Sequence, residues 1–381
     1  MLILASIALI AWLTVLLLPW QAHRARECFE PSAAPTELDD VTVLIPARNE
    51  AEHIESTLKA LARQGSSLQV IVVNDESSDD TADVCRRLSK QLASVNTDRF
   101  ALNIVLVEGC PLPDAWGGKL WALHQGLDRI DRPYTLLLDA EIELSAKVLP
   151  SLLQFARSEE LSLLSIMARL RCNTVWERLL TPPFIYFFKL LYPFALVNTE
   201  HSTVAAAAGG CILIRTDVLH SVGGFEEICA ALIDDCALAS QVKKRHGKIW
   251  LGLSQSVRSM RSYSKLSDFW QMVSRTAFTQ LRYSMCLLLL TSLVMLVVFL
   301  APMVLLGSPN SATDVVIASL ALVAMAASYW PTVSYYQLSV LWVLTLPLAA
   351  ILFLAMTWSS AFAYWRGTRA RWKNRAYQVS D

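Results

Sequence analysis

The chain has 381 residues, of which 54% are hydrophobic and 17% are charged, and its formal net charge is zero. This length is sufficient for two domains, but the composition is more apolar than that of ordinary soluble domains. Basic residues do not cluster outside the C-terminal tail, which argues against a nucleic-acid partner. Because the composition is so apolar, we expect part of the chain to lie in a membrane.

The eight cysteines are scattered along the chain, and none belongs to a C-x-x-C pair. This pattern is typical of reduced cytosolic thiols that act as small core residues. It argues against both a disulfide framework and a zinc site.

The first predicted element is an almost unbroken apolar run from Leu2 to Trp20. A membrane span needs about 20 apolar residues. No basic residue precedes the run, whereas Arg24 and Arg26 follow it, which reverses the charge order of a signal peptide. We predict a transmembrane anchor over residues 1–21, and the positive-inside rule places the following domain in the cytoplasm.

Residues 40 to 140 alternate between short β-branched runs and segments with helical periodicity. The predicted strands are 41–46, 68–74, 103–108 and 134–139. The first predicted helix is capped by Asn49 and has Ile54, Leu58 and Leu61 along one face, and the next two lie near 81–92 and 119–127. Continuous apolar strands alternating with helices indicate an α/β domain with a parallel sheet covered on both faces.

Three acidic clusters follow predicted strands: residues 48–50, 74–76 and 139–141. Ligands of such sheets bind beyond the carboxyl ends of the strands, where the strand order reverses. A single cluster is better explained as an ordinary polar loop, but three clusters at one edge favour a binding site. Neither a G-x-G-x-x-G loop nor a Walker A loop is present, which disfavours a dinucleotide-binding oxidoreductase and excludes a P-loop NTPase.

The second half of the chain returns to apolar sequence. Residues 173–200 are rich in aromatic residues and interrupted by prolines, so we predict interfacial helices, with aromatic packing inside a core as the alternative. Three apolar runs, 285–307, 315–330 and 338–358, predict transmembrane segments over 285–358.

The tail over residues 359–381 is basic and is expected in the cytoplasm, although three spans would place it outside. Either one apolar segment is re-entrant or interfacial, with 315–330 the best candidate, or the tail breaks the charge rule.

Seven short motifs occur in a fixed order along the chain. They are PARNE (46–50), VVNDESSDDT (72–81), WGGKLWALHQG (116–126), DAE (139–141), AGGCILIRTDVLHSVGGF (208–225), IDDCAL (233–238) and TQLRY (279–283). Together they resemble the membrane-bound family 2 glycosyltransferases with a GT-A fold, and most closely those associated with hopanoid biosynthesis. The resemblance implies a cytoplasmic GT-A domain over 40–284 in a multi-pass protein of the inner membrane.

The same resemblance implies a site for a nucleotide-sugar donor, expected to be a UDP-sugar. Its donor-binding residues would be Pro46, Ala47, Glu50, Asp75, Gly118, Lys119 and Asp139. A carboxylate accepts hydrogen bonds from a base or ribose, and a lysine beside a glycine turn meets phosphate charge. The alternative for Gly118 and Lys119 is an ordinary glycine turn, and the alternative for the acidic stretch that begins at Asp75 is a turn at the start of a helix.

Asp139 and Glu141 match the DxD position of the family, which implies that they bind Mg²⁺ or Mn²⁺. Both ions prefer hard oxygen ligands and complete their coordination with phosphate and water. The second aspartate is a glutamate here, so Asp139 is the more secure ligand.

Asp235 matches the catalytic base of the family, and Asp234 would support it in an inverting transfer. An N-terminal helix cap is the alternative for this pair. Gly209, Gly210 and Phe225 would border the acceptor pocket. Because TQLRY resembles a (Q/R)xxRW signature, Arg282 would stabilise the diphosphate and Tyr283 would stack on the acceptor, unless the two residues only anchor the next membrane helix.

We therefore predict an inverting glycosyltransferase that moves a sugar from a nucleotide donor to a membrane lipid. A hopanoid acceptor rests on the resemblance alone. A polysaccharide synthase of the same family is one alternative, and a catalytically weak scaffold that binds nucleotide-sugar or lipid is another.

Overall fold

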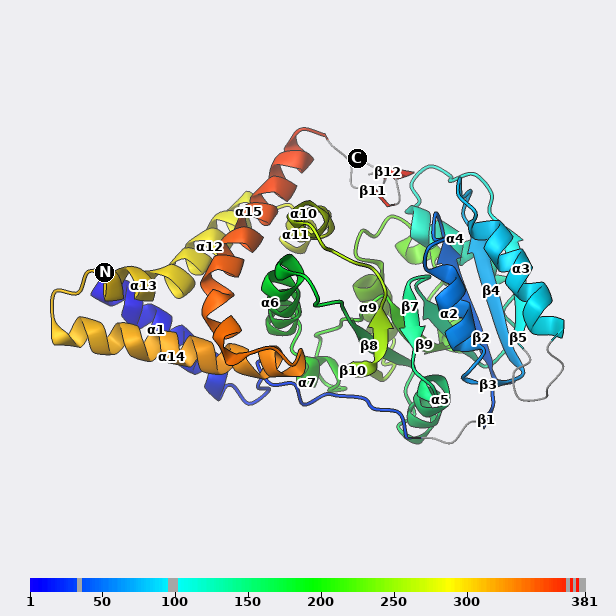
Figure 1. Cartoon of the computed structure of the whole chain (residues 1–381), viewed down its shortest axis with the longest axis horizontal. Helices are drawn as coiled ribbons and strands as arrows, with labels where there is room; N and C mark the ends of the chain where they lie inside the picture. Colours follow the sequence, from blue (N-terminus) through cyan, green and yellow to red (C-terminus); the bar gives the residue numbers. More distant parts are fainter. Residues whose placement is uncertain (33–35, 95–101, 368–370, 373–374, 377–381) are drawn as a thin grey trace. The chain divides into compact units, whose positions relative to one another are not determined.

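The computed structural model describes residues 1–32, 36–94, 102–367, 371–372 and 375–376. The chain forms two compact units (Figure 1). The α/β unit contains residues 27–171, 196–261 and the described part of 371–381. The helical unit contains residues 1–26, 172–195 and the described part of 262–370.

Within its described residues, the α/β unit is built on a sheet of eight strands in the order β5-β4-β2-β6-β9-β8-β10-β7. These strands are β2 (Val41–Ala47), β4 (Leu68–Asn74), β5 (Leu102–Glu108), β6 (Tyr134–Leu138), β7 (Ile142–Leu144), β8 (Leu163–Arg169), β9 (Cys211–Arg215) and β10 (Ile249–Ser259). The four strands β5, β4, β2 and β6 pair in parallel. Strands β8 and β10 also pair in parallel, whereas β9 is antiparallel to its neighbours β6 and β8 and β7 is antiparallel to β10. The sheet is therefore mostly parallel.

The helices of this unit alternate with the strands. They are α2 (Ile54–Leu61), α3 (Thr81–Ser94), α4 (Gly118–Leu127), α5 (Val148–Ser158), α8 (Thr216–Ser221), η1 (Glu226–Ile228) and α9 (Asp234–Lys244). Two small pairs complete the unit, β1 (Thr36–Glu37) with β3 (Gly65–Ser66) and β11 (Arg371–Trp372) with β12 (Arg375–Ala376). The four strands predicted between residues 40 and 140, and the helices near 81–92 and 119–127, are confirmed to within a few residues. The predicted Asn49 cap is wrong, because α2 begins at Ile54 with His53 as its N-cap, and the Asn49 side chain instead accepts from the Ser78 amide.

Both faces of the parallel part of the sheet are covered. Successive side chains of a strand point to opposite faces. Val43 and Ile45 of β2 belong to a core that includes α2, α3 and α5. On the other face, a Cβ atom at Gly126 of α4 would lie 2.3 Å from Leu44 and 3.1 Å from Val73. The continuous apolar strands of the sequence reflect this double burial.

The strand order reverses between β2 and β6. From β2 the chain passes outward through β4 to β5 and then returns to place β6 on the other side of β2. The carboxyl ends of β2 and β6 therefore flank a topological switch point, where α/β proteins of this class bind their ligands.

The acidic turn after β6 is held by buried hydrogen bonds. The Thr57 hydroxyl of α2 donates to the carbonyl oxygen of Ala140 at 2.7 Å. The Asp139 amide donates to the Gly210 carbonyl at 3.1 Å, which joins the turn to the segment before β9. Asp139 and Glu141, on either side of Ala140, thus project from a fixed backbone.

The helical unit contains α1 (Leu2–Leu17), α6 (Val175–Leu191), α10 (Leu266–Ser274), α11 (Ala277–Gln280), α12 (Met285–Met295), the π-helical η2 (Leu296–Leu300), α13 (Ala301–Gly307), α14 (Ala312–Tyr335), η3 (Val340–Thr345) and α15 (Leu346–Trp365). The short α7 (Phe194–Val197) lies at the boundary of the two units along the chain. In the described part of the chain, three helical segments are long and apolar enough to cross a membrane: Met285–Gly307, Ala312–Tyr335 and Val340–Trp365. The middle segment, the suspected re-entrant one, forms a helix of 24 residues.

The N-terminal helix is shorter than the apolar run that predicts it. α1 has 16 residues and ends at Leu17, with Leu18 in an extended conformation. Leu18 precedes Pro19, and a residue before proline is disfavoured in the helical conformation. At 1.5 Å per residue, α1 is about 24 Å long, which is less than the roughly 30 Å of a bilayer core.

A tryptophan joins α1 to the π-helical segment within this unit. Pro302 has no amide hydrogen, so it cannot donate to the Val298 carbonyl four residues earlier. The Trp12 indole donates to that carbonyl at 3.1 Å, and the Trp12 ring lies 5.1 Å from Phe299, edge to face. The side chain thus replaces the hydrogen bond that the proline removes.

The aromatic segment around α6 is a continuous helix of 17 residues that includes Pro182 and Pro183. A capping box of Thr174 and Glu177 begins it. Tyr186 is buried and its hydroxyl lies 2.7 Å from Ser328 of α14, while Phe187 packs on Phe353 of α15. The described aromatics thus pack within the helical unit, and an interfacial placement stays a prediction.

We expect Thr57→Val to destabilise the α/β unit by about 1–2 kcal/mol, because the buried Ala140 carbonyl loses its donor. The midpoint of thermal unfolding of the detergent-solubilised protein measures this change. Ser56→Ala removes a hydroxyl that bonds only locally to His53 and serves as the control. Equal midpoints for Thr57→Val and wild type would contradict this role.

Candidate active site

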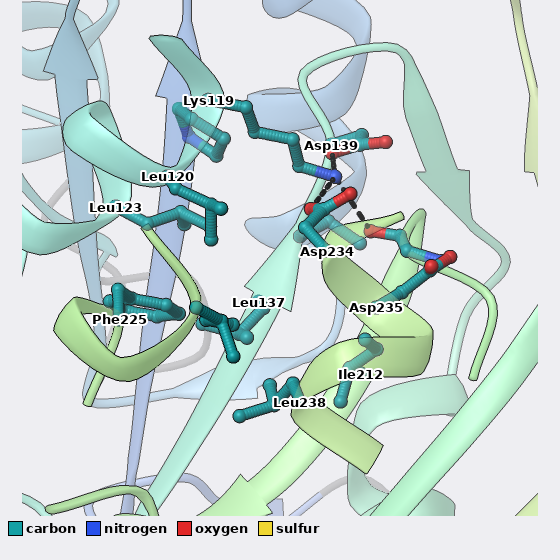
Figure 2. Close-up of a pocket in the computed structure, with 14 residues that line it drawn as sticks. Lys119, Leu120, Leu123, Leu137, Asp139, Ile212, Phe225, Asp234, Asp235 and Leu238 are labelled. Carbon is teal, nitrogen blue, oxygen red and sulfur yellow. Dashed lines mark hydrogen bonds and ion pairs between the residues drawn. The ribbon is translucent and has the colours of Figure 1, made fainter. Parts of the chain in front are cut away.

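Four ionisable side chains from three segments of the chain meet at the carboxyl edge of the sheet (Figure 2). Lys119 lies in the first turn of α4, which begins at Gly118. Asp139 follows β6, and Asp234 and Asp235 begin α9. The Gly117 amide donates to the Cys229 carbonyl at 2.7 Å, which ties the start of α4 to the chain just before α9.

The Lys119 ammonium is at the centre of this cluster. Its Nζ atom lies 2.9 Å from Asp139 Oδ1 and 3.3 Å from Asp234 Oδ2, and it donates to the Gly209 carbonyl at 3.4 Å. Only 14% of the Lys119 side chain is exposed. Figure 2 shows the Asp139 and Asp234 carboxylates converging on the ammonium.

The charges of the cluster do not balance, because one ammonium faces three carboxylates. Burial opposes the charged form of Lys119, but Asp139 and Asp234 outweigh burial and raise its pKa. Burial raises the pKa of Asp139, and the nearby Glu141 adds to the rise, while Lys119 opposes it. The excess of negative charge suits a site for cationic or metal-bound ligands.

Asp235 is held by two backbone amides. The Gly209 amide donates to Oδ2 and the Cys236 amide to Oδ1, each at 2.7 Å. Burial, followed by repulsion from Asp234, raises the pKa of Asp235 to about 6. A Cβ atom at position 209 would lie 3.1 Å from Asp235 Oδ2 and 3.2 Å from Lys119 Nζ, so glycine is what lets both groups approach the backbone.

Glu141 has a different cationic partner. Its Oε1 atom lies 3.0 Å from Arg261 Nε, while Arg261 Nη2 lies 3.1 Å from Glu50 Oε1. Arg261 thus joins two of the predicted acidic residues. No sequence motif marks Arg261, because it follows β10, a strand that none of the seven motifs covers.

The predicted nucleoside side is assembled at the ends of β2 and β4. The Asp75 amide donates to the Ala47 carbonyl at 2.8 Å, which brings Asp75 beside Pro46 and Ala47. The Asp75 side chain is fully buried, and Arg48 Nη1 lies 3.6 Å from its Oδ2 atom. Arg48 also donates to the Asp75 carbonyl at 2.5 Å.

The predicted acceptor residues of the α/β unit are close to the cluster but differ in exposure. Gly210 directly precedes β9, and a Cβ atom there would lie 3.1 Å from Ile142. Phe225 is only 1% exposed and lines a cavity of ≈ 10 Å³ that also reaches Lys119 and Asp235. Such a volume holds about one water molecule. Acceptor contact by Phe225 stays a prediction.

Arg282 and Tyr283 belong to the helical unit, and both have left-handed backbone conformations, with φ of 52° and 55°. The Tyr283 ring stacks on Tyr364 of α15, with 4.4 Å between ring centroids, and its hydroxyl accepts from Thr279 at 3.1 Å. These contacts agree with the alternative in which Tyr283 anchors the neighbouring membrane helix. Stabilisation of the diphosphate by Arg282 and stacking of Tyr283 on the acceptor stay predictions.

No group of three or more His, Cys, Asp or Glu side chains surrounds a common metal position among the residues that the structure describes. Asp139 and Asp234 nevertheless converge on one cation, the Lys119 ammonium. Carboxylate oxygens are ligands that Mg²⁺ and Mn²⁺ prefer, and both ions take further ligands from phosphates and water. Asp139 therefore fits as a ligand of a divalent ion that binds together with a phosphate, with Glu141 on the same turn as the predicted second ligand.

The chain is similar to known glycosyltransferases in sequence. Residues 42–223 match the family model "Glycosyl transferase family 2". The chain is 29% identical over 128 residues to a 4,4'-diaponeurosporenoate glycosyltransferase of Staphylococcus haemolyticus, covering 33% of this chain and 31% of that protein. It is 26% identical over 211 residues to the probable glycosyltransferase YdaM of Bacillus subtilis, covering 54% of this chain and 47% of the relative. The chain thus spans less than half the length of these relatives.

A poly-beta-1,6-N-acetyl-D-glucosamine synthase of Staphylococcus aureus is 31% identical over 113 residues, covering 29% of this chain and 24% of the synthase. Among solved structures, the mannosyltransferase PcManGT from Pyrobaculum calidifontis, in complex with GDP-Man and Mn²⁺, superposes with a TM-score of 0.51 at 18% identity. This alignment covers 94% of this chain and 99% of the mannosyltransferase. Residues 42–223 are thus similar to family 2 glycosyltransferases in sequence, and the α/β unit has a GT-A-like fold.

Proposed function

We propose that the protein transfers a sugar, with inversion, from a nucleotide-sugar donor to a hydroxyl group of a membrane lipid. The observation that carries this proposal is the cluster of Lys119 with Asp139, Asp234 and Asp235 at the switch point of a GT-A-like sheet. A buried group of carboxylates beside a lysine suits both binding of a diphosphate and removal of a proton.

In this proposal Asp235 is the catalytic base. The acceptor oxygen forms a bond to the anomeric carbon, its proton passes to Asp235, and the bond from that carbon to the nucleotide diphosphate breaks. The two amides at 2.7 Å hold the carboxylate in position for this step. With a pKa of about 6, Asp235 is mostly ionised at neutral pH and still a better proton acceptor than an ordinary aspartate.

The donor site uses residues on both sides of the cluster. Pro46, Ala47, Glu50 and Asp75 would bind the nucleoside, and Gly118 with Lys119 would meet the phosphates. A divalent cation would be held by Asp139 and Glu141, and when bound it neutralises charge on the departing diphosphate. The mannosyltransferase of similar fold, which is described in complex with GDP-Man and Mn²⁺, supports both a nucleotide-sugar donor and a divalent ion, and it makes GDP as well as UDP worth testing.

The acceptor is proposed to be a lipid because three segments are long and apolar enough to cross a membrane. With Arg24 and Arg26 after α1, we infer a protein of the inner membrane whose α/β unit faces the cytoplasm. A relative named for transfer to 4,4'-diaponeurosporenoate supports a small acceptor, and a hopanoid remains our specific candidate.

The similarity to a polysaccharide synthase supports a second candidate function. A single glycolipid product, as opposed to a long glycan, would distinguish them.

We expect Asp235→Asn to lower nucleotide release by about 10²- to 10⁴-fold, because an amide cannot accept the acceptor proton at neutral pH. The assay uses full-length protein in detergent, a panel of UDP- and GDP-sugars, Mn²⁺ or Mg²⁺, and a hopanoid extract. Asp217→Asn, an exposed acid paired with Arg215, is the matched control. Wild-type turnover by Asp235→Asn would exclude Asp235 as the base, and intact nucleotide binding without turnover by wild type would favour a scaffold.

The same substitution is expected to change how stability depends on pH. The pKa of Asp235 is raised from 3.8 to about 6, so the folded protein loses stability relative to the protonated form as the pH rises from about 4 through about 6. An asparagine at this position has no such titration, although it accepts from only one of the two backbone amides and so carries a cost that does not depend on pH. The stability of Asp235→Asn relative to wild type should therefore rise by on the order of 1–2 kcal/mol between pH 5 and pH 8. Thermal unfolding at both pH values tests this, and a relative stability that is higher at pH 5 would contradict it.

Removal of divalent cations by EDTA should abolish turnover, and Mn²⁺ or Mg²⁺ should restore it. If Glu141 contributes to the metal site, Glu141→Gln raises the Mn²⁺ concentration for half-maximal turnover about tenfold or more, while Glu141→Asp has a smaller effect. Arg261→Gln removes the ion pair between Arg261 and Glu141, and it tests the alternative that Glu141 has no role beyond that pair. An unchanged Mn²⁺ requirement in Glu141→Gln would leave Asp139 as the only ligand of the pair.

A further inference from the structure

The lysine expected to meet the donor phosphates is engaged with the carboxylates of the site itself. Its ammonium is 2.9 Å from Asp139 and 3.3 Å from Asp234, and it also bonds to the Gly209 carbonyl. Asp139 is the more secure of the two predicted metal ligands. The ammonium therefore contacts an oxygen that a divalent cation would need.

We propose that Lys119 is a resident counter-ion, which keeps a divalent cation from binding at Asp139 until a nucleotide diphosphate enters and engages the ammonium. This inference rests on the proposed function and adds an order to its binding events. The metal alone binds weakly, and metal and nucleotide each strengthen the binding of the other.

The physical reason is charge. A divalent ion at Asp139 would lie close to the ammonium in a poorly solvated site, where like charges repel strongly. The chain around Lys119 is close-packed, since a Cβ atom at Gly209 would already lie 3.2 Å from Nζ. A diphosphate supplies negative charge and new acceptors for the ammonium, which removes the repulsion. Such a coupling between two ligands is necessarily reciprocal.

Arg261 is a second cationic side chain in contact with this turn, at Glu141 on the other side of Ala140 from Asp139. It lies 3.0 Å from Glu141 and 3.1 Å from Glu50, so both carboxylates of the predicted metal pair contact a cationic side chain of the chain itself. Two counter-ions in one acidic turn are hard to reconcile with a site prepared to bind a metal ion by itself. They suit a site that changes partners when its anionic ligand arrives.

The test measures Mn²⁺ binding to full-length protein in detergent by electron paramagnetic resonance, without turnover. In wild type, saturating UDP or GDP should tighten Mn²⁺ binding about tenfold or more. In Lys119→Met, Mn²⁺ alone should bind about tenfold more tightly than in wild type, and the tightening by the nucleotide should be about tenfold smaller, because only the coupling through phosphate ligation remains. Lys119→Arg, which keeps the charge, should behave like wild type.

Lys90→Met, at an exposed position of α3, is the matched control and should leave Mn²⁺ binding unchanged. Equal Mn²⁺ affinity of wild type with and without a nucleotide that does bind would overturn the counter-ion role, even if Lys119→Met fails to fold. Unchanged Mn²⁺ affinity of a folded Lys119→Met would overturn it too. By contrast, failure of both UDP and GDP to bind, with or without Mn²⁺, would overturn the proposed function itself.

Discussion

The candidate site depends on one buried ammonium among carboxylates. Lys119 reaches Asp139 and Asp234 from a separate helix, and without it the negative charges at the carboxyl edge of the sheet would repel each other at close range. The lysine thus holds together three segments of the chain that are far apart in sequence. It remains charged despite its burial because its partners raise its pKa.

Backbone groups and small residues make this arrangement possible. Gly209 offers its carbonyl to Lys119 and its amide to Asp235, and a side chain at this position would crowd both. Thr57 holds the Ala140 carbonyl from behind, so the two acidic residues beside it keep their direction. Precise placement of a site commonly needs such supporting hydrogen bonds.

The chemistry that we propose conflicts with stability at one residue. A base must carry its charge at neutral pH, yet burial and Asp234 both disfavour the charged form of Asp235. Functional sites often retain such costs because the rest of the fold outweighs them. Here the buried sheet core supplies that stability, while the described helical unit contains segments long and apolar enough to cross a membrane.

The sequence by itself determined the parallel strands, their helices and the order of the acidic turns, because hydrophobic periodicity and strand ends are local signals. It did not determine the partners within the site. That Lys119 meets Asp139 and Asp234, that Arg261 joins Glu141 to Glu50, and that Tyr283 stacks on Tyr364 follow from side chains brought together over long sequence distances. Ion pairs and ring contacts depend on distances in space, and only the tertiary structure sets those distances.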